Sequence, residues 1–108
     1  MLDPLEKVER DRHNGMYMAY TYVLQSIKDG SYYVGSTSDF KKRYAQHTKG
    51  CVRSTKSKLP VKVVFLKMFT SFQEARAFEI KIKSWKKRSS IEKMLNKPDN
   101  IAKYCPVV

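Results

Sequence analysis

The sequence of 108 residues predicts an α+β fold, in which a small three-stranded antiparallel sheet is flanked by helices in the order ββαβαα. Three patterns support this prediction. Two runs rich in aromatic and β-branched residues, 17–26 and 31–37, are separated by a glycine-containing turn. A third apolar run covers 61–69, and helical signals follow the second and third runs. A chain of this length has room for one domain with a single core.

The first two strands are expected to form a hairpin. Asp29-Gly30 suits a two-residue turn, because glycine readily adopts positive φ. Side chains alternate along a strand, so this turn would place Tyr22, Leu24, Tyr33 and Gly35 on one face. Gly35 would then open space beside two phenols. The predicted pairs are Tyr22 with Thr37, Leu24 with Gly35, and Ser26 with Tyr33.

The other elements are a helix over about 40–48, a basic loop over 51–60 and a long helix over 72–88. Ser38-Asp39 can cap the first helix and Gly50 can end it, while Thr70 or Ser71 can cap the second. Ser89-Ser90 is expected to break the long helix before a short one over 91–97. An apolar stripe at helical spacing supports the long helix, made of Phe72, Ala75, Phe78, Ile82 and Trp85.

The chain divides into an N-terminal extension over 1–15, either disordered or introduced by cloning, a domain over 16–98 and a tail over 99–108. No apolar run is long enough to cross a membrane, and the N-terminus is too polar for a signal peptide. Cys51 and Cys105 are expected to be unpaired thiols of a reducing cytosol. These features favour a cytoplasmic location.

The net charge of +12 is concentrated in one part of the chain. Residues 41–88 carry fifteen Lys or Arg against two acids, whereas residues 1–40 have four bases and six acids. This concentration favours a polyanionic partner, most simply nucleic-acid phosphates, over a solvated basic surface without a partner. A membrane surface is disfavoured, because no long basic amphipathic helix stands clear of the core.

Three polar residues stand out in the predicted helices. Arg43 and His47 are four positions apart and therefore project to one side of their helix. Alternatively, Arg43 covers the surface and His47 caps the C-terminus of the helix. Glu79 borders the apolar stripe, where an acid is uncommon without a partner. It pairs with Lys83 or serves as the carboxylate ligand of a divalent metal ion.

These residues also form a pattern that resembles the GIY-YIG nuclease superfamily, in its compact single-domain form. The first motif stands as Thr21-Tyr22-Val23, with Thr21 in place of the usual glycine, and the second as Tyr33-Val34-Gly35. Arg43, His47 and Glu79 follow in the expected order, so the likeness covers about residues 17–98. The domain is similar to the GIY-YIG domain of bacterial excision-repair nucleases.

The resemblance implies an endonuclease that hydrolyses DNA phosphodiester bonds with Mg²⁺ or Mn²⁺. Tyr22, Tyr33, Arg43, His47 and Glu79 would be catalytic, with Glu79 as the metal ligand and Gly35 and Asn96 as further candidates. Arg43 would contact phosphate oxygens. Either Tyr22 or His47 would accept the proton of the attacking water, since a phenol needs nearby positive charge to act as a base and a histidine does not.

Basic side chains around these residues are expected to hold the DNA backbone. Phosphate contacts carry no sequence information, so the expected enzyme is structure-selective or weakly sequence-specific, in DNA repair or recombination, with target choice supplied by a protein partner. The alternatives are a catalytically inactive nucleic-acid-binding module of the same fold and a basic adaptor for an acidic protein. The predicted DNA contacts are Lys41, Lys42, Arg53, Lys56, Lys58, Lys86 and Lys87, extended by Lys81 and Arg88.

Overall fold

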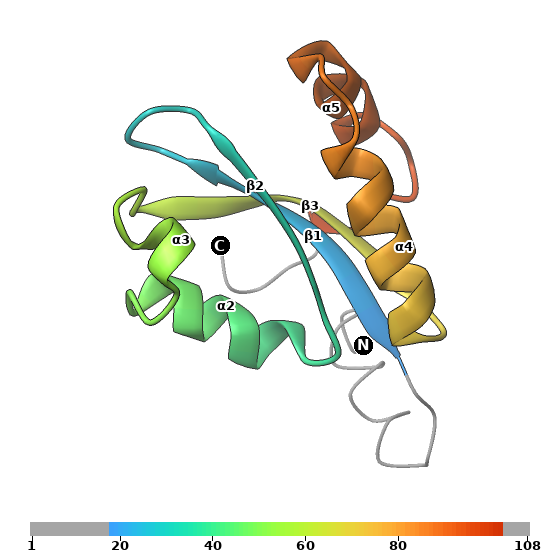
Figure 1. Cartoon of the computed structure of the whole chain (residues 1–108), viewed down its shortest axis with the longest axis horizontal. Helices are drawn as coiled ribbons and strands as arrows, with labels where there is room; N and C mark the ends of the chain where they lie inside the picture. Colours follow the sequence, from blue (N-terminus) through green and yellow to red (C-terminus); the bar gives the residue numbers. More distant parts are fainter. Residues whose placement is uncertain (1–17, 103–108) are drawn as a thin grey trace.

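A computed structural model describes residues 18–102 of the chain, and it confirms the predicted α+β class (Figure 1). Three antiparallel strands form one sheet in the order β2-β1-β3. The elements follow the predicted order with one additional short helix. They are β1 (Ala19–Ser26), β2 (Tyr32–Thr37), α2 (Phe40–Thr48), α3 (Arg53–Lys56), β3 (Val61–Phe69), α4 (Phe72–Lys83) and α5 (Arg88–Leu95).

The sheet separates two apolar cores. Helices α2 and α3 cover one face and α4 covers the other, with the edge strand β2 in front between them in Figure 1. Side chains at even positions of β1, such as Tyr22 and Leu24, join the core under α2. Val23, at an odd position, joins Phe65 and Ile82 in the core under α4. Because the central strand is buried on both faces, functional side chains can lie on either face of the same sheet.

The hairpin keeps the predicted faces but not the predicted register. Tyr22 pairs with Gly35 and Leu24 with Tyr33, a shift of two residues from the expected pairing. Five residues, Ile27 to Ser31, separate the strands, and the Ser26 side chain accepts a hydrogen bond from the Asp29 amide while the Asp29 side chain accepts bonds from Ser31. A shift of two leaves every side chain on its predicted face, whereas a shift of one would reverse them all.

The capping predictions for α2 and for the start of α4, where the Ser71 side chain accepts from the Glu74 amide, are confirmed, whereas the predicted end of the long helix needs correction. The Asp39 side chain accepts from the Lys42 amide, and Gly50, at φ +77°, ends α2 with its amide bonded to the His47 carbonyl. The predicted basic loop contains α3. The long helix ends at Lys83, and extended backbone at Lys87 precedes α5. Ser89-Ser90 therefore lies in the first turn of α5 and breaks no helix.

Residues 100–102, which the sequence assigned to a tail, pack against the outer edge of β3. The Asn100 side chain accepts from the Leu66 amide at 3.1 Å and donates to the Val64 carbonyl at 3.0 Å. These bonds satisfy backbone groups that an edge strand would otherwise leave open. Cys51 is exposed, while Cys105 and the predicted extension over 1–15 lie outside the described residues. Within residues 18–102, no helix has the length and apolar character to cross a membrane.

On the α2 face of the sheet, the side chain of Tyr22 in β1 packs closely against the backbone of Gly35 in β2. A Cβ atom at Gly35 would collide with the hydroxyl oxygen and the ring of Tyr22. The space expected beside Gly35 is therefore filled by the Tyr22 phenol, which is 1% exposed. Glycine is required here because Tyr22 passes directly over the backbone of β2, not because of its φ angle.

This contact predicts that Gly35→Ala destabilises the fold by about 1 to 3 kcal/mol, since the added methyl group overpacks a filled site. Urea denaturation measures the loss. In a Tyr22→Leu background, which removes the colliding atoms, the same substitution should cost roughly 1 kcal/mol less. An equal cost in both backgrounds would show that the collision does not determine the choice of glycine.

Candidate active site

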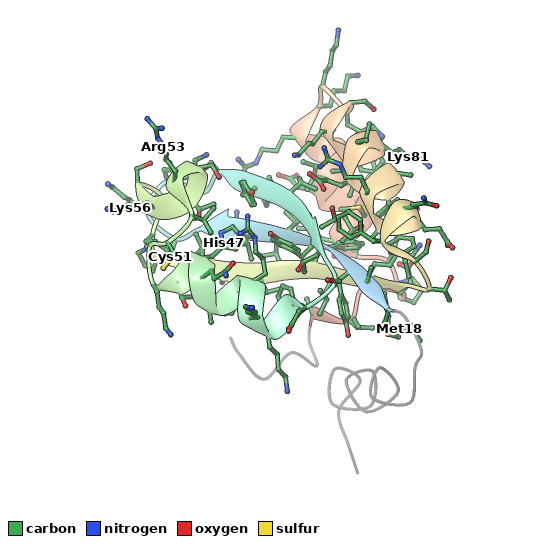
Figure 2. All side chains as sticks on the ribbon, turned by 60° about the horizontal axis from the view of Figure 1, so that its bottom comes forward. Met18, His47, Cys51, Arg53, Lys56 and Lys81 are labelled. Carbon is green, nitrogen blue, oxygen red and sulfur yellow. The ribbon has the colours of Figure 1, made fainter. Side chains whose placement is uncertain are left out.

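Tyr22 and His47 meet under α2 and share a hydrogen bond. Tyr22 comes from the central strand and His47 from the last turn of α2, and neither side chain is more than 1% exposed. The Tyr22 hydroxyl lies 2.9 Å from His47 Nε2, and the ring centroids are 5.7 Å apart in an edge arrangement. The alternative in which His47 caps the helix C-terminus is wrong, because its ring points into the core (Figure 2).

The other ring nitrogen of His47 contacts a residue that the sequence did not single out. His47 Nδ1 lies 2.7 Å from the hydroxyl of Thr55, which is fully buried in α3. The same hydroxyl donates to the Val52 carbonyl at 3.4 Å. No hydropathy pattern reveals Thr55, because the surrounding segment is basic and its single helical turn is too short to show periodicity.

Tyr33, Gly35 and Arg43 complete this side of the site. The Tyr33 ring centroid lies 5.1 Å from that of His47 and 6.4 Å from that of Tyr22. Arg43 is half-buried and donates to the Gln46 side chain at 3.1 Å. Interaction first with the Tyr22 hydroxyl, and also with Tyr33, raises the pKa of Arg43. The structure thus brings together the predicted tyrosines, arginine and histidine, with Arg43 facing the phenols rather than only covering the surface.

The buried environment sets the protonation of the central pair. Burial raises the pKa of Tyr22 to about 12, although the Arg43 guanidinium opposes this effect. Burial and, second, the charge of Arg43 lower the pKa of His47 to about 4. At neutral pH, Tyr22 is therefore a phenol and His47 a neutral imidazole.

Glu79 approaches the same part of β2 from the opposite face of the sheet. It lies on α4, is 3% exposed and accepts a hydrogen bond from Ser36, the residue after Gly35. Arg76 and Lys83 donate to its other oxygen, so the predicted pair with Lys83 is present. Burial raises the pKa of Glu79, but the bonds from Lys83, Ser36 and Arg76 outweigh it and leave the pKa below its usual value.

The site therefore wraps around the edge strand β2 at Gly35-Ser36. The Tyr22 hydroxyl lies over Gly35 on one face, and Glu79 binds Ser36 on the other. The charge of Glu79 is near enough to contribute to the raised pKa of Tyr22. Thr21, which stands where the family motif has glycine, points to the α4 face as expected and donates to the Ala75 carbonyl at 2.6 Å.

The predicted DNA contacts divide between two sides of this edge. Arg53 and Lys56 project outward from α3, whereas Lys81 lies on α4 across the sheet (Figure 2). Lys58 is half-buried and donates to Ser31, and Lys41 is half-buried as well. Arg88 stacks on the Tyr32 ring and donates to the Gly30 carbonyl, which anchors the hairpin loop to α5. The remaining predicted contacts are exposed: Lys42, Lys86 and Lys87.

Among the contacts of the described residues, none joins the Asn96 side chain to Glu79. It forms the C-terminal cap of α5, is exposed, and donates to the Glu92 carbonyl of its own helix at 3.4 Å. The neighbouring Asn100 is engaged with β3. The geometry thus gives Asn96 a local role in ending the helix.

Glu79 and Ser36 are the groups suited to a divalent metal ion. Among the described residues, no group of three or more His, Cys, Asp or Glu side chains could enclose a metal. Mg²⁺ does not need such a cage, because it often binds one or two carboxylates and keeps several waters. One carboxylate beside a hydroxyl fits that mode, but Arg76 and Lys83 already donate to one oxygen of Glu79 and Ser36 donates to the other.

The low pKa of His47 predicts a dependence of stability on pH. The unfolded chain binds a proton at His47 below about pH 6.5, whereas the folded chain resists protonation until about pH 4. Folding should therefore lose roughly 2 to 3 kcal/mol as the pH falls through this window. Urea denaturation from pH 7 to 4 measures the loss, and His47→Gln should reduce it. Parallel pH dependences in the two proteins would contradict a buried neutral His47.

Comparison with known proteins identifies the family of the chain. A family model described as the GIY-YIG catalytic domain matches residues 18–94. The UPF0213 protein of Streptococcus pneumoniae serotype 4 is 40% identical over 91 residues, which cover 82% of this chain and 90% of that protein. UPF0213 protein CPE1444 of Clostridium perfringens is 33% identical over 81 residues, with coverage of 74% and 86%.

A solved structure supports the same assignment. The solution NMR structure of UPF0213 protein BH0048 from Bacillus halodurans matches this chain with a TM-score of 0.50 and 30% sequence identity. The match covers 76% of this chain and 86% of that one. The chain therefore belongs to the GIY-YIG family of nucleases, in the compact form of its UPF0213 relatives.

Proposed function

We propose that this protein is an endonuclease that hydrolyses DNA phosphodiester bonds with the help of Mg²⁺ or Mn²⁺. The observation that carries the proposal is the hydrogen bond between the Tyr22 hydroxyl and a neutral His47, beside Arg43 and across β2 from Glu79. A buried phenol–imidazole pair next to a guanidinium and a carboxylate supplies the groups that phosphodiester hydrolysis requires.

Tyr22 and His47 form a relay for the proton of the attacking water. The phenol gives its own proton to His47 Nε2, so a lone pair of its oxygen remains for the proton of the water. Passing one proton on while receiving another avoids a free phenolate, which the raised pKa of Tyr22 disfavours. His47 is a weak base in the free protein, but a bound phosphate would raise its pKa toward the ordinary value.

Arg43 controls both charge and access. Its guanidinium is permanently charged and presents several donors to the non-bridging oxygens of a phosphate. Tyr22 is 1% exposed, with the half-buried Tyr33 and Arg43 beside it. Movement of Arg43 toward a phosphate would open the Tyr22 hydroxyl to water at the moment when the substrate binds.

Glu79 would hold the metal ion, with Ser36 as its neighbour. When bound there, the metal would polarise the phosphate and stabilise the leaving oxygen. The positive charges of Arg76 and Lys83 keep the carboxylate ionised in the free protein, so no proton has to leave before the metal binds.

The DNA backbone would cross the free edge of β2 between the two groups of basic side chains. This arrangement would contact phosphates, and residues 18–102 include no evident base-reading element, which favours structure-selective or weakly sequence-specific cleavage in repair or recombination. A protein partner would then direct the enzyme to its target. The relatives come from bacteria. In bacterial cells the DNA lies in the cytoplasm as the nucleoid, so a DNA-cleaving protein is expected in the cytoplasm.

A catalytically inactive DNA-binding module is the rival function, and one observation favours it. The Glu79 carboxylate already accepts bonds from Ser36, Arg76 and Lys83, which satisfy it without a metal ion. Such a module would bind DNA but cleave none of the substrates tested with any divalent metal.

The proposal predicts metal-dependent nicking of supercoiled plasmid or of flap and junction DNA. Glu79→Gln should abolish nicking while DNA binding persists, and Tyr22→Phe should lower the rate by roughly 100-fold or more, because it removes the proton relay. Rates of nicking and DNA affinities measure both effects.

Glu74→Gln is the matched control. Glu74 is an exposed acid on the same helix, and its carboxylate accepts hydrogen bonds from the hydroxyls of Thr70 and Ser71. Its nicking rate should equal that of the wild type. Nicking by Glu79→Gln at the wild-type rate would contradict the proposed site, and DNA binding without nicking by the wild type would support the rival.

The proposed DNA surface predicts a weaker salt dependence when its charges are removed. Replacing Arg53 and Lys56 together by Gln should lower the slope of log affinity against log salt concentration by about 2. Equilibrium binding to duplex DNA at several salt concentrations measures the slope. The control replaces Lys62 and Lys67 on β3, the opposite edge strand, and should leave the slope unchanged. Equal slopes in all three proteins would exclude α3 from the interface.

A further inference from the structure

Thr55 lies in a position that can determine which nitrogen of His47 carries the proton. Its side chain is fully buried, and its hydroxyl lies 2.7 Å from His47 Nδ1 and 3.4 Å from the Val52 carbonyl, the two groups that bear on this choice. We infer that Thr55 is a positioning residue that holds His47 in the tautomer with a proton on Nδ1 and a bare Nε2 facing Tyr22.

The donors and acceptors around the ring lead to this tautomer from one side. The Val52 carbonyl can only accept, so the Thr55 proton points to it and the Thr55 oxygen is left to accept from His47. In this arrangement, the Thr55 oxygen is the acceptor 2.7 Å from Nδ1, and Nδ1 carries the proton. A neutral imidazole has one N–H, which leaves Nε2 as an acceptor.

The groups around Tyr22 lead to the same tautomer from the other side. In the opposite tautomer, Nε2 would donate to the Tyr22 oxygen, and the phenol proton would need another acceptor. Arg43, whose guanidinium is near enough to oppose the rise in the pKa of Tyr22, carries donors only. With a bare Nε2, the phenol proton has an acceptor at 2.9 Å. Both ends of the chain of hydrogen bonds therefore agree.

The backbone of α3 holds the Thr55 hydroxyl in place. The α2 helix ends with two bonds that turn the chain back, from Gly50 to the His47 carbonyl and from Cys51 to the Gln46 carbonyl. The Thr55 and Lys56 amides then bond to the Val52 carbonyl, which fixes the single turn of α3 beside the His47 ring. The orientation of Thr55 is thus built into the segment that follows His47.

This inference rests on the proposed function only for its catalytic consequence. In the relay, Tyr22 can release its proton only if Nε2 is bare, so Thr55 would set the direction of proton transfer. The tautomer itself is a property of the folded protein and can be measured without DNA or metal. Failure of the proposed function would therefore not conceal the result.

Long-range proton–nitrogen NMR of the ¹⁵N-labelled full chain at pH 7 tests the tautomer. The wild type should show a protonated Nδ1 and an unprotonated Nε2 on His47. The chain has one other histidine, and a His13→Gln variant separates its signals. A protonated Nε2 in the wild type would overturn the inference without any further variant.

Two variants test the part played by Thr55. Thr55→Val keeps the shape but removes the hydroxyl, so the Nδ1 tautomer should no longer dominate. Thr55→Ser keeps the hydroxyl and should restore the wild-type spectrum. An unchanged tautomer in a folded Thr55→Val protein would overturn the inference, as would a Thr55→Ser protein with the spectrum of Thr55→Val. If Thr55→Val does not fold, the wild-type and Thr55→Ser spectra still decide.

Kinetics then separate positioning from simple packing. Thr55→Val should lower kcat for nicking by roughly 10-fold with little change in KM, because the residue acts through His47 and not on DNA. Thr55→Ser should recover most of this loss. A Thr55→Val protein with a changed KM and an unchanged kcat would overturn the positioning role.

Discussion

The hydrogen bond between Tyr22 and His47 is the interaction on which the rest of the site depends. It requires glycine at position 35, because the phenol passes directly over β2 to reach the imidazole. It requires α2 to lie on that face of the sheet and Thr55 to satisfy the far nitrogen of the ring. The fold and the site are therefore one arrangement, in which a packing contact between two strands also aligns a proton donor with its acceptor.

Burial gives this bond its chemical character. A phenol with a raised pKa and an imidazole with a lowered pKa are both neutral at physiological pH, so the buried pair carries no net charge. The charges of the site, Arg43 and Glu79, lie around this pair, and Glu79 is separated from it by β2. In the proposed mechanism, this separation would let a phosphate meet cationic and metal-binding groups at the edge of the sheet while the Tyr22–His47 pair stays shielded from bulk water.

Much of this arrangement could be predicted from the sequence, and the errors have physical causes. Alternation along the strands placed Tyr22, Tyr33 and Gly35 on one face even though the register was wrong by two, because an even shift preserves the face. Helical spacing placed Arg43 and His47 together. Thr55 could not be found, since a single turn in a basic segment has no periodicity and its burial follows from how α2 and α3 meet. Of the three hydrogen-bond partners of Glu79, only Lys83 was predicted from the sequence; Ser36 and Arg76 were not.

The central claim is that Tyr22 and His47 act as one unit in hydrolysis. Nicking rates of Tyr22→Phe, His47→Ala and the double variant test it most directly. If the two residues form one relay, the double variant should be no slower than the slower single variant, because either substitution already breaks the path of the proton. Losses that multiply in the double variant would contradict the account, and so would a single variant that nicks at the wild-type rate.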